Sequence, residues 1–201
     1  MKKLESTLPN MILSLGIICV LSGLLLGGAY SITKEPIAIQ MKKQQQQAVI
    51  DVAPPFNNDP EKEKWQTEID GALFTVYPAM QDGKLVGGAV EGSSMNGFAG
   101  EITVICGFDV NGTVRDYRVI RQAETPGLGS KMETWFRDPT ASRSVLGKNP
   151  ESFSFYVTKD SGGQVDAITA ATISSRAFLE ILRNAFTAYK AFLSSHNHEI
   201  N

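Results

Sequence analysis

The stretch at residues 101–120, EITVICGFDVNGTVRDYRVI, decides the fold of this chain. Apolar and β-branched residues fill 101–108 and 113–120, and Asp109-Val-Asn-Gly112 joins the two runs. Asn-Gly between two such runs is a strong short-range signal for a β-hairpin. We therefore predict two antiparallel strands here, and we place the other elements around them.

More strands are expected before this hairpin, and one strand and a helix after it. Residues 74–77 and 84–90 flank the turn sequence Gln81-Asp82-Gly83, and 152–158 is predicted as a further short strand. A last helix is expected to begin near Ser174 or Ser175. Its apolar stripe is interpreted as core packing rather than a cofactor surface, and it consists of Phe178, Leu182, Ala185, Phe186, Tyr189 and Leu193.

An uncharged apolar segment precedes these elements. Residues 11–32 read MILSLGIICVLSGLLLGGAYSI. As a helix they would span about 33 Å, and the hydrocarbon of a bilayer is roughly 30 Å thick. The apolar part of a cleaved signal peptide is usually about 7–15 residues long, so a retained transmembrane anchor is favoured. Lysines stand on both sides of the segment, so the positive-inside rule does not decide its orientation.

A second helix is expected directly after the anchor. Thr33 could cap it, Pro36 suits its first turn, and Pro54-Pro55 would stop it after about Val52. The predicted organisation is a transmembrane anchor at 1–33, a stalk or linker at 34–70, one domain at 71–195 and a polar tail at 196–201. The domain is predicted to be α+β, with short antiparallel strands and a long C-terminal helix.

Composition and charge exclude several classes of function. The net charge is −2, and no basic stripe alternates with aromatic residues, so nucleic acid is not an expected partner. Cys19 and Cys106 should lie in lipid and in a folded core, respectively, so no disulfide is expected. These cysteines and the tail residues His196 and His198 form no metal-ligand pattern, which excludes a carrier with its own iron–sulfur or haem ligands.

The stretch Asp166-Ala-Ile-Thr-Ala-Ala-Thr-Ile-Ser-Ser175 carries the strongest chemical signal. Its small residues would let a bulky ligand approach the backbone. Exposed N–H groups and the helix dipole would favour a phosphate at this end of the last helix. From these residues alone a plain N-cap cluster without a ligand is favoured, because Ser and Thr caps are common. The hydroxyl groups concerned belong to Thr169, Thr172, Ser174 and Ser175.

Two glycine-containing stretches precede it. In Glu124-Thr-Pro-Gly-Leu-Gly129 the Pro-Gly pair marks a tight turn, and the glycines would permit close approach of a flat or phosphorylated ligand. Glu124 could accept hydrogen bonds from ring or ribitol groups, although a plain surface loop is an equally good interpretation. The other stretch, Asn96-Gly-Phe-Ala-Gly100, is a weaker signal on its own.

Taken in this order, the three stretches resemble the G subunit of the Rnf electron-transport complex and, more distantly, the C subunit of the sodium-pumping NADH:quinone reductase. The resemblance covers nearly the whole chain. In that family a flavin transferase attaches FMN at the pattern Asp-x-x-(Ser/Thr)-Gly-Ala-Thr-x-(Ser/Thr). The resemblance implies that Thr172 is the acceptor of a phosphoester bond to FMN. The matching residues are Asp166, Thr169, Ala171, Thr172 and Ser174.

The other two stretches are similar to family segments that surround the flavin. Gly97-Phe98-Ala99-Gly100 is similar to a glycine–aromatic–glycine loop. The resemblance implies that the second stretch lines the flavin and that some of its side chains contact the ring or the ribitol. The residues that it implies as cofactor-binding there are Glu124, Thr125, Gly127 and Leu128.

Two residues depart from the family's pattern. Ala170 stands where glycine is usual: a negative φ there would leave the attachment loop unstrained, and a positive φ would strain it. Gln122 stands where a histidine often precedes the Glu-Thr-Pro run, so any proton role of that histidine is absent here.

The resemblance implies an electron-transfer subunit of a bacterial inner-membrane complex that couples electron flow between ferredoxin and NAD⁺ to ion translocation. It would be a redox carrier without independent catalysis, anchored in lipid by one helix, with its FMN domain on the periplasmic side. Its partners would be other membrane subunits and, during maturation, the flavin transferase. The alternatives are a membrane-tethered binding or sensing module without flavin, and a stand-alone extracytoplasmic flavin reductase. The reductase is disfavoured because no acid–base pair stands near the motif.

Overall fold

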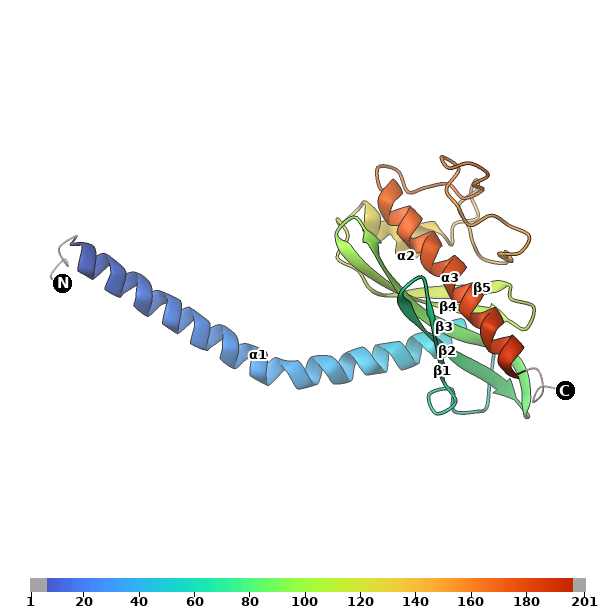
Figure 1. Cartoon of the computed structure of the whole chain (residues 1–201), viewed down its shortest axis with the longest axis horizontal. Helices are drawn as coiled ribbons and strands as arrows, with labels where there is room; N and C mark the ends of the chain where they lie inside the picture. Colours follow the sequence, from blue (N-terminus) through green and yellow to red (C-terminus); the bar gives the residue numbers. More distant parts are fainter. Residues whose placement is uncertain (1–6, 197–201) are drawn as a thin grey trace. The chain divides into compact units, whose positions relative to one another are not determined.

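The computed structural model describes residues 7–196, and the chain divides into two compact units, Met1–Lys43 and Gln44–Asn201 (Figure 1). The predicted polar tail lies outside the described residues except for His196, which ends the last helix. The candidate site lies entirely in the second unit.

The first helix, α1, is continuous over Leu8–Val52, so the prediction of separate anchor and stalk helices is wrong. Thr33 does not cap a new helix, because its hydroxyl donates to the carbonyl oxygen of Ala29 at 2.9 Å, one turn earlier. Pro36 lies inside the helix and lacks only the N–H that would bond to residue 32. The predicted end at Val52 is confirmed.

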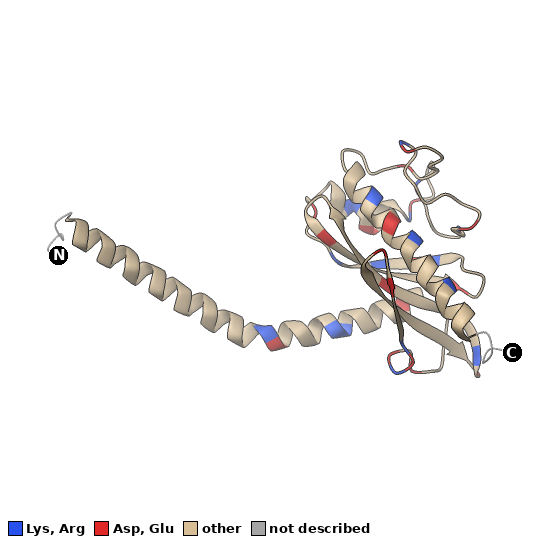
Figure 2. Cartoon of the chain, viewed as in Figure 1, with Lys and Arg blue, Asp and Glu red and all other residues tan. Residues whose placement is uncertain are grey.

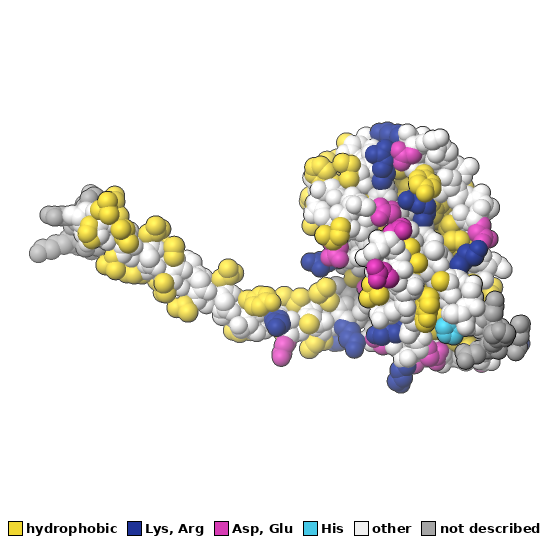
Figure 3. All heavy atoms as spheres, viewed as in Figure 1, with side chains coloured by type: hydrophobic (Ala, Val, Ile, Leu, Met, Phe, Trp, Pro, Cys, Tyr) yellow, Lys and Arg dark blue, Asp and Glu magenta, His cyan; other side chains and the backbone are white. Residues whose placement is uncertain are grey.

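The part of α1 in the first unit is a candidate membrane span by its length and composition. Its most apolar window has no side chain buried in the protein. Figure 2 shows the first part of the helix without charged residues, and Figure 3 shows hydrophobic side chains along it. Burying so much apolar surface requires an apolar surrounding, which a bilayer supplies.

The second unit contains a five-stranded antiparallel sheet in the order β1-β2-β3-β4-β5. The predicted hairpin at 101–120 is confirmed, and so is the pair around the Gln81-Asp82-Gly83 turn. The strands are β1 Trp65–Ile69, β2 Ala72–Gln81, β3 Lys84–Gly97, β4 Gly100–Asp109 and β5 Val114–Arg121.

Two predictions about strands need correction. The range predicted as stalk or linker contains β1, whose Trp65 packs its ring on Phe192 with the centroids 6.0 Å apart. No strand forms at 152–158, where Val157 makes only an isolated bridge to Val165. Phe155 and Val157 of this segment are buried in the core, but its backbone bonds locally, as in the bond from Ser152 N–H to Asn149 O. The apolar residues that suggested a strand at 152–158 are therefore explained by burial in the core and not by pairing with another strand.

The two faces of the sheet are covered by different helices. The last helix, α3 Thr172–His196, packs its apolar stripe on one face, and it begins two or three residues before the predicted start at Ser174 or Ser175. The last turns of α1 pack on the opposite face through Ala48, Val49 and Val52. The approach of α1 is close, because a Cβ on Gly107 would lie 2.0 Å from the carbonyl oxygen of Val52.

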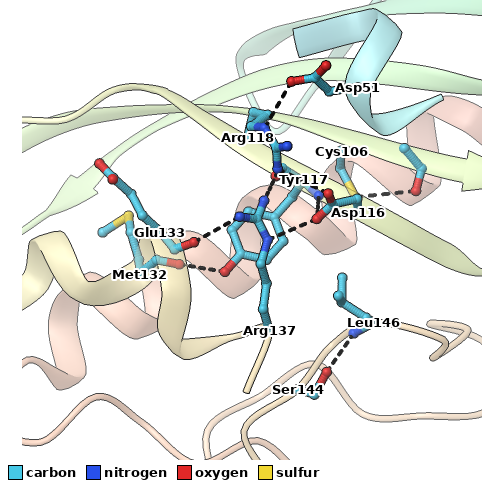
Figure 4. A network of polar contacts seen from close by, with 11 residues as sticks. Asp51, Cys106, Asp116, Tyr117, Arg118, Met132, Glu133, Arg137, Ser144 and Leu146 are labelled. Carbon is cyan, nitrogen blue, oxygen red and sulfur yellow. Dashed lines mark hydrogen bonds and ion pairs between the residues drawn. The ribbon is translucent and has the colours of Figure 1, made fainter. Parts of the chain in front are cut away.

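A polar network holds the segment after β5, which includes a short 3₁₀ turn, η1 Gly129–Lys131, and the helix α2 Met132–Trp135 (Figure 4). Arg137 Nε donates to Asp116 at 2.9 Å, and the guanidinium lies 4.4 Å from the centre of the Tyr117 ring. The Tyr117 hydroxyl donates to the Met132 carbonyl oxygen at 2.6 Å. Arg118 links Asp116 to Asp51 at the end of α1. The network thus ties α2 and its loops to the sheet.

Candidate functional site

Three segments that are far apart in the sequence meet at the N-terminus of α3. They are the turn between β3 and β4, the loop after β5, and the residues just before and within the first turn of α3. Together they enclose a cavity of about 170 Å³. Its lining residues are Phe98, Glu124, Thr125, Leu128, Gly129, Ala170, Ala171, Ile173 and Ser174.

The buried side chain of Glu124 links the three segments by hydrogen bonds. Its side chain is only 5% exposed. One carboxylate oxygen accepts from the Ser174 hydroxyl at 2.6 Å, and the other accepts from the Ala99 N–H at 3.0 Å. The Glu124 N–H donates to the Gln122 side-chain oxygen at 2.8 Å, so Gln122 helps to hold this loop. Contact of Glu124 with a flavin ring stays a prediction.

The glycines beside Glu124 make room for its carboxylate. A Cβ on Gly129 would lie 2.5 Å from one Glu124 oxygen and 2.7 Å from the Ser174 hydroxyl. A Cβ on Gly97 would lie 2.8 Å from the other Glu124 oxygen. The sequence interpretation assigned Gly129 to the approach of a ligand, but in the fold Gly129 and Gly97 both make room for a buried side chain of the protein itself.

The exposed part of the Glu124–Gly129 loop faces the cavity mouth. Gly127 adopts φ +76°, and its N–H donates to the Ser130 hydroxyl at 3.0 Å, which closes the turn. Thr125 is exposed, and its carbonyl oxygen accepts from the Leu128 N–H at 3.1 Å. Leu128 is 39% exposed, an apolar side chain left at the surface beside the cavity.

The hydroxyl groups of the predicted cluster have different surroundings. Ser175 is buried, accepts from the Ile168 N–H and donates to the Ala171 carbonyl oxygen, both at 2.9 Å. Ser174 is buried against Glu124. Thr169 is exposed. Thr172 is the first residue of α3, and its hydroxyl oxygen accepts from Lys159 Nζ at 3.2 Å.

This arrangement differs from a plain N-cap cluster. In the described part of the chain, no hydroxyl of the cluster accepts a hydrogen bond from the first-turn N–H groups of α3. Those groups carry the positive end of the helix dipole, which attracts anions. The end of the helix therefore keeps the properties of an anion-binding site, with the Thr172 hydroxyl at its edge.

Ala170 adopts φ +62° and is exposed. It is the residue that stands where the family pattern has glycine, so the departure falls on a left-handed backbone position. For an L-residue with a Cβ this conformation costs about 1–2 kcal/mol. The loop that leads into Thr172 is therefore strained, which is the less favourable of the two outcomes foreseen from the sequence.

Asp166 and Ala171 have structural surroundings. The Asp166 carboxylate accepts from the Thr158 hydroxyl at 3.2 Å and from the Ser142 N–H at 3.3 Å. The Asp166 carbonyl oxygen accepts from the indole N–H of Trp135 at 2.9 Å. Ala171 is 8% exposed and belongs to the core. Asp166 thus ties together the turns that lead to α3.

Lys159 was missed by the sequence interpretation. It lies thirteen residues before Thr172, outside any helical or strand periodicity, and only the folding back of the chain brings the two side chains together. A single lysine next to Asp160-Ser-Gly-Gly163 offers no recognisable signal in the sequence.

Comparison with known proteins agrees with this geometry. Residues 97–187, which contain all three segments, match the family described as FMN-binding domain. A protein of Aliivibrio fischeri strain MJ11, named as the G subunit of an ion-translocating oxidoreductase complex, is 32% identical over 195 residues, which cover 92% of this chain and 91% of the relative.

Proteins of the same name from two other bacteria give the same result. The one from Vibrio cholerae is 35% identical over 179 residues, covering 83% of this chain and 82% of the relative. The one from Salmonella typhimurium is 32% identical over 158 residues, covering 76% and 77%. The chain therefore belongs to the G-subunit family of the Rnf-type ion-translocating oxidoreductase complexes and carries that family's FMN-binding domain.

Proposed function

We propose that this chain carries electrons on one FMN that is joined by a phosphoester bond to Thr172. The observation that carries the proposal is the meeting of three distant segments around a cavity at the N-terminus of α3, the helix whose first residue is Thr172. The chain would act as a subunit of a membrane complex that couples electron flow between ferredoxin and NAD⁺ to ion translocation.

The residues present fit FMN at both of its ends. At the cavity, the apolar side chains of Phe98, Leu128 and Ile173 are 69%, 39% and 49% exposed. Apolar side chains gathered around a cavity favour a flat apolar group. At the start of α3, the N–H groups, the Thr172 hydroxyl and the Lys159 ammonium suit a phosphate.

Each part of the site would have a defined role. Phe98 and Leu128 would hold the ring, and Thr125 would reach the ribitol. The end of α3 would stabilise the negative charge of the phosphodiester. When bound, FMN supplies one-electron redox chemistry, and the protein supplies position and electrostatics. Glu124 would hold the three segments together through its hydrogen bonds to Ala99 and Ser174.

The location and partners follow from the same proposal. We infer that α1 crosses the bacterial inner membrane once and that the domain lies on the periplasmic side, where FMN from the cytoplasm cannot replace a lost cofactor. A covalent bond prevents such loss. The partners would be the other membrane subunits, bilayer lipid and, during maturation, the flavin transferase.

Mass measurement of the full chain tests the attachment. We expect the chain co-expressed with a family flavin transferase to gain the mass of FMN less one water and to fluoresce in a denaturing gel. Thr172→Ala should do neither, because it lacks the acceptor oxygen. Thr187→Ala is the matched control, since it removes an exposed threonine of the same helix that lies outside the pattern, and it should behave as the wild type.

The outcomes separate the alternatives. Equal masses for Thr172→Ala and the wild type would place the attachment elsewhere. A colourless wild type would favour the membrane-tethered sensing module. Turnover of a small electron acceptor by the purified flavinylated chain without other subunits would favour the stand-alone reductase.

A further inference from the structure

Lys159 lies beside the acceptor hydroxyl although it belongs to none of the three segments that form the cavity. Its Nζ donates to Thr172 Oγ1 at 3.2 Å, and the residue is exposed. The contact is therefore not a by-product of burial. It brings a positively charged ammonium group within hydrogen-bond distance of Thr172 Oγ1, the oxygen that the proposed modification uses.

The turn that carries Lys159 is held firmly at its base. Val157 and Val165 form a bridge across it, and the Thr158 N–H donates to the Val165 carbonyl oxygen at 2.8 Å. Gly163 allows the chain to double back, because a Cβ there would lie 1.9 Å from the Val157 carbonyl oxygen. The backbone on both sides of Lys159 is thus held within this turn.

An ion pair fixes the same turn to α3 itself. The Asp160 carboxylate accepts from Arg176 Nη2 at 2.6 Å and from its Nε at 3.0 and 3.2 Å. The hydrogen bonds from Arg176 lower the pKa of the Asp160 carboxyl, so the pair stays ionised at neutral pH. Arg176 lies one turn after Thr172, so the pair holds the residue next to Lys159 against the turn that carries the acceptor.

We propose that Lys159 orients the Thr172 hydroxyl for its modification and stabilises the negative charge that develops on its oxygen. The proposal rests on the proposed function and deepens it. In the transfer, a bond forms between Thr172 Oγ1 and the FMN phosphorus of FAD, and the pyrophosphate bond to AMP breaks. AMP leaves with that bond's electron pair, and the hydroxyl proton passes to a base of the transferase or to water.

The charge of Lys159 acts on both sides of this step. Negative charge develops on Thr172 Oγ1 as its proton leaves, and an ammonium in hydrogen-bond contact stabilises that charge. In the product the same ammonium lies within reach of the phosphodiester anion. The contact also sets which way the hydroxyl oxygen points before the transferase binds.

Steady-state kinetics of the flavin transferase test the proposal, with detergent-purified full-length chain as the acceptor substrate, FAD and Mg²⁺. Lys159→Met removes the charge and keeps the length of the side chain. We expect it to lower kcat by about tenfold, below the hundredfold or more seen for donors in dry active sites, because Lys159 is exposed. Lys159→Arg should stay within about threefold of the wild type, since it keeps a cation and N–H donors.

Two controls make the result specific. Lys84→Met removes an exposed lysine at the start of β3 and should leave kcat unchanged. The thermal unfolding temperature of Lys159→Met should equal that of the wild type, because exposed charge contacts contribute little to stability.

The outcomes that would overturn the proposal differ from those that would overturn the proposed function. A kcat for Lys159→Met equal to that of the wild type, or an increase in KM for the acceptor chain alone, would show that the lysine does not act on the reacting oxygen. In either case the wild type would still be flavinylated at Thr172. Absence of flavin from the wild type itself would overturn the proposed function.

Discussion

Ala170 adopts a left-handed backbone conformation that residues with a Cβ rarely take. Its φ of +62° lies immediately before the buried Ala171 and Thr172, the proposed acceptor. The strain persists because the segments on both sides are held: Ser175 bonds to Ile168 and Ala171, and Glu124 bonds to Ser174. Glycine would remove the strain without removing any of these contacts.

Ala170→Gly should therefore stabilise the protein. Relief of left-handed strain is worth about 1–2 kcal/mol, and the extra freedom of glycine in the unfolded chain costs about 0.4–1 kcal/mol. We expect a net gain of about 0.5–1 kcal/mol in the free energy of unfolding, measured by chemical denaturation of the purified chain. Ala123→Gly is the control: it lies outside the positive-φ positions, so only the unfolded-state cost should appear. A loss of stability in both variants would contradict the strain argument.

At the scale of elements, the site depends on how three loops are held together and not on any one of them. The turn between β3 and β4 bonds through the Ala99 N–H, the loop after β5 carries Glu124, and α3 bonds through Ser174. The Arg137–Asp116 ion pair and the Tyr117–Met132 bond fix the second loop to β5. The buried Glu124 carboxylate, which accepts a hydrogen bond on each oxygen, therefore links the β3–β4 turn and α3 to the loop after β5.

Glu124→Met tests this role. Methionine keeps the length of the side chain but has no oxygen to accept a hydrogen bond, so the Ala99 N–H and the Ser174 hydroxyl both lose their partner. Leaving a buried donor unsatisfied costs about 1–3 kcal/mol, and we expect that loss in the free energy of unfolding. Glu133→Met makes the same chemical change on the exposed face of α2 and should alter stability by less than about 0.5 kcal/mol. Equal losses of stability in both variants would show that Glu124 does not hold the three segments together.

At the scale of the whole molecule, the folded unit begins before the sheet does. Gln44 is the first residue of the second unit. Val49 and Val52 are buried against the face of the sheet opposite α3, and β1 pairs with β2 over Trp65–Ile69. The domain start predicted at residue 71 would leave out all of these contacts.

Two truncated chains separate these boundaries. A chain that begins at Gln44 should be soluble without detergent and unfold cooperatively, because it keeps the whole core and loses the apolar segment. A chain that begins at Gly71 should be destabilised by several kcal/mol, since burying a valine contributes about 1.5–3 kcal/mol and two are lost together with β1. The melting temperatures of the two chains distinguish the two boundaries. Equal values would support a domain that begins at residue 71.

The sequence by itself determined the local elements and the kind of site. Alternating apolar runs with turn residues between them predicted the hairpins, and a long uncharged segment predicted the candidate span, because these signals depend on neighbours along the chain. The motif around Thr172 predicted the family, which the relatives confirm. The strand at 152–158 was wrong because apolar residues there are buried by contacts from distant segments.

Only the tertiary structure decided which groups act on one another. The sequence offers no signal that Glu124 lies beneath Ser174, that Gly129 makes room for it, or that Lys159 reaches Thr172. The sequence also offers no signal that the end of α1, which was predicted as a stalk, packs on a face of the sheet. The reason is physical: side-chain contacts across loops depend on chain reversals whose directions are set by the whole fold and not by local propensity.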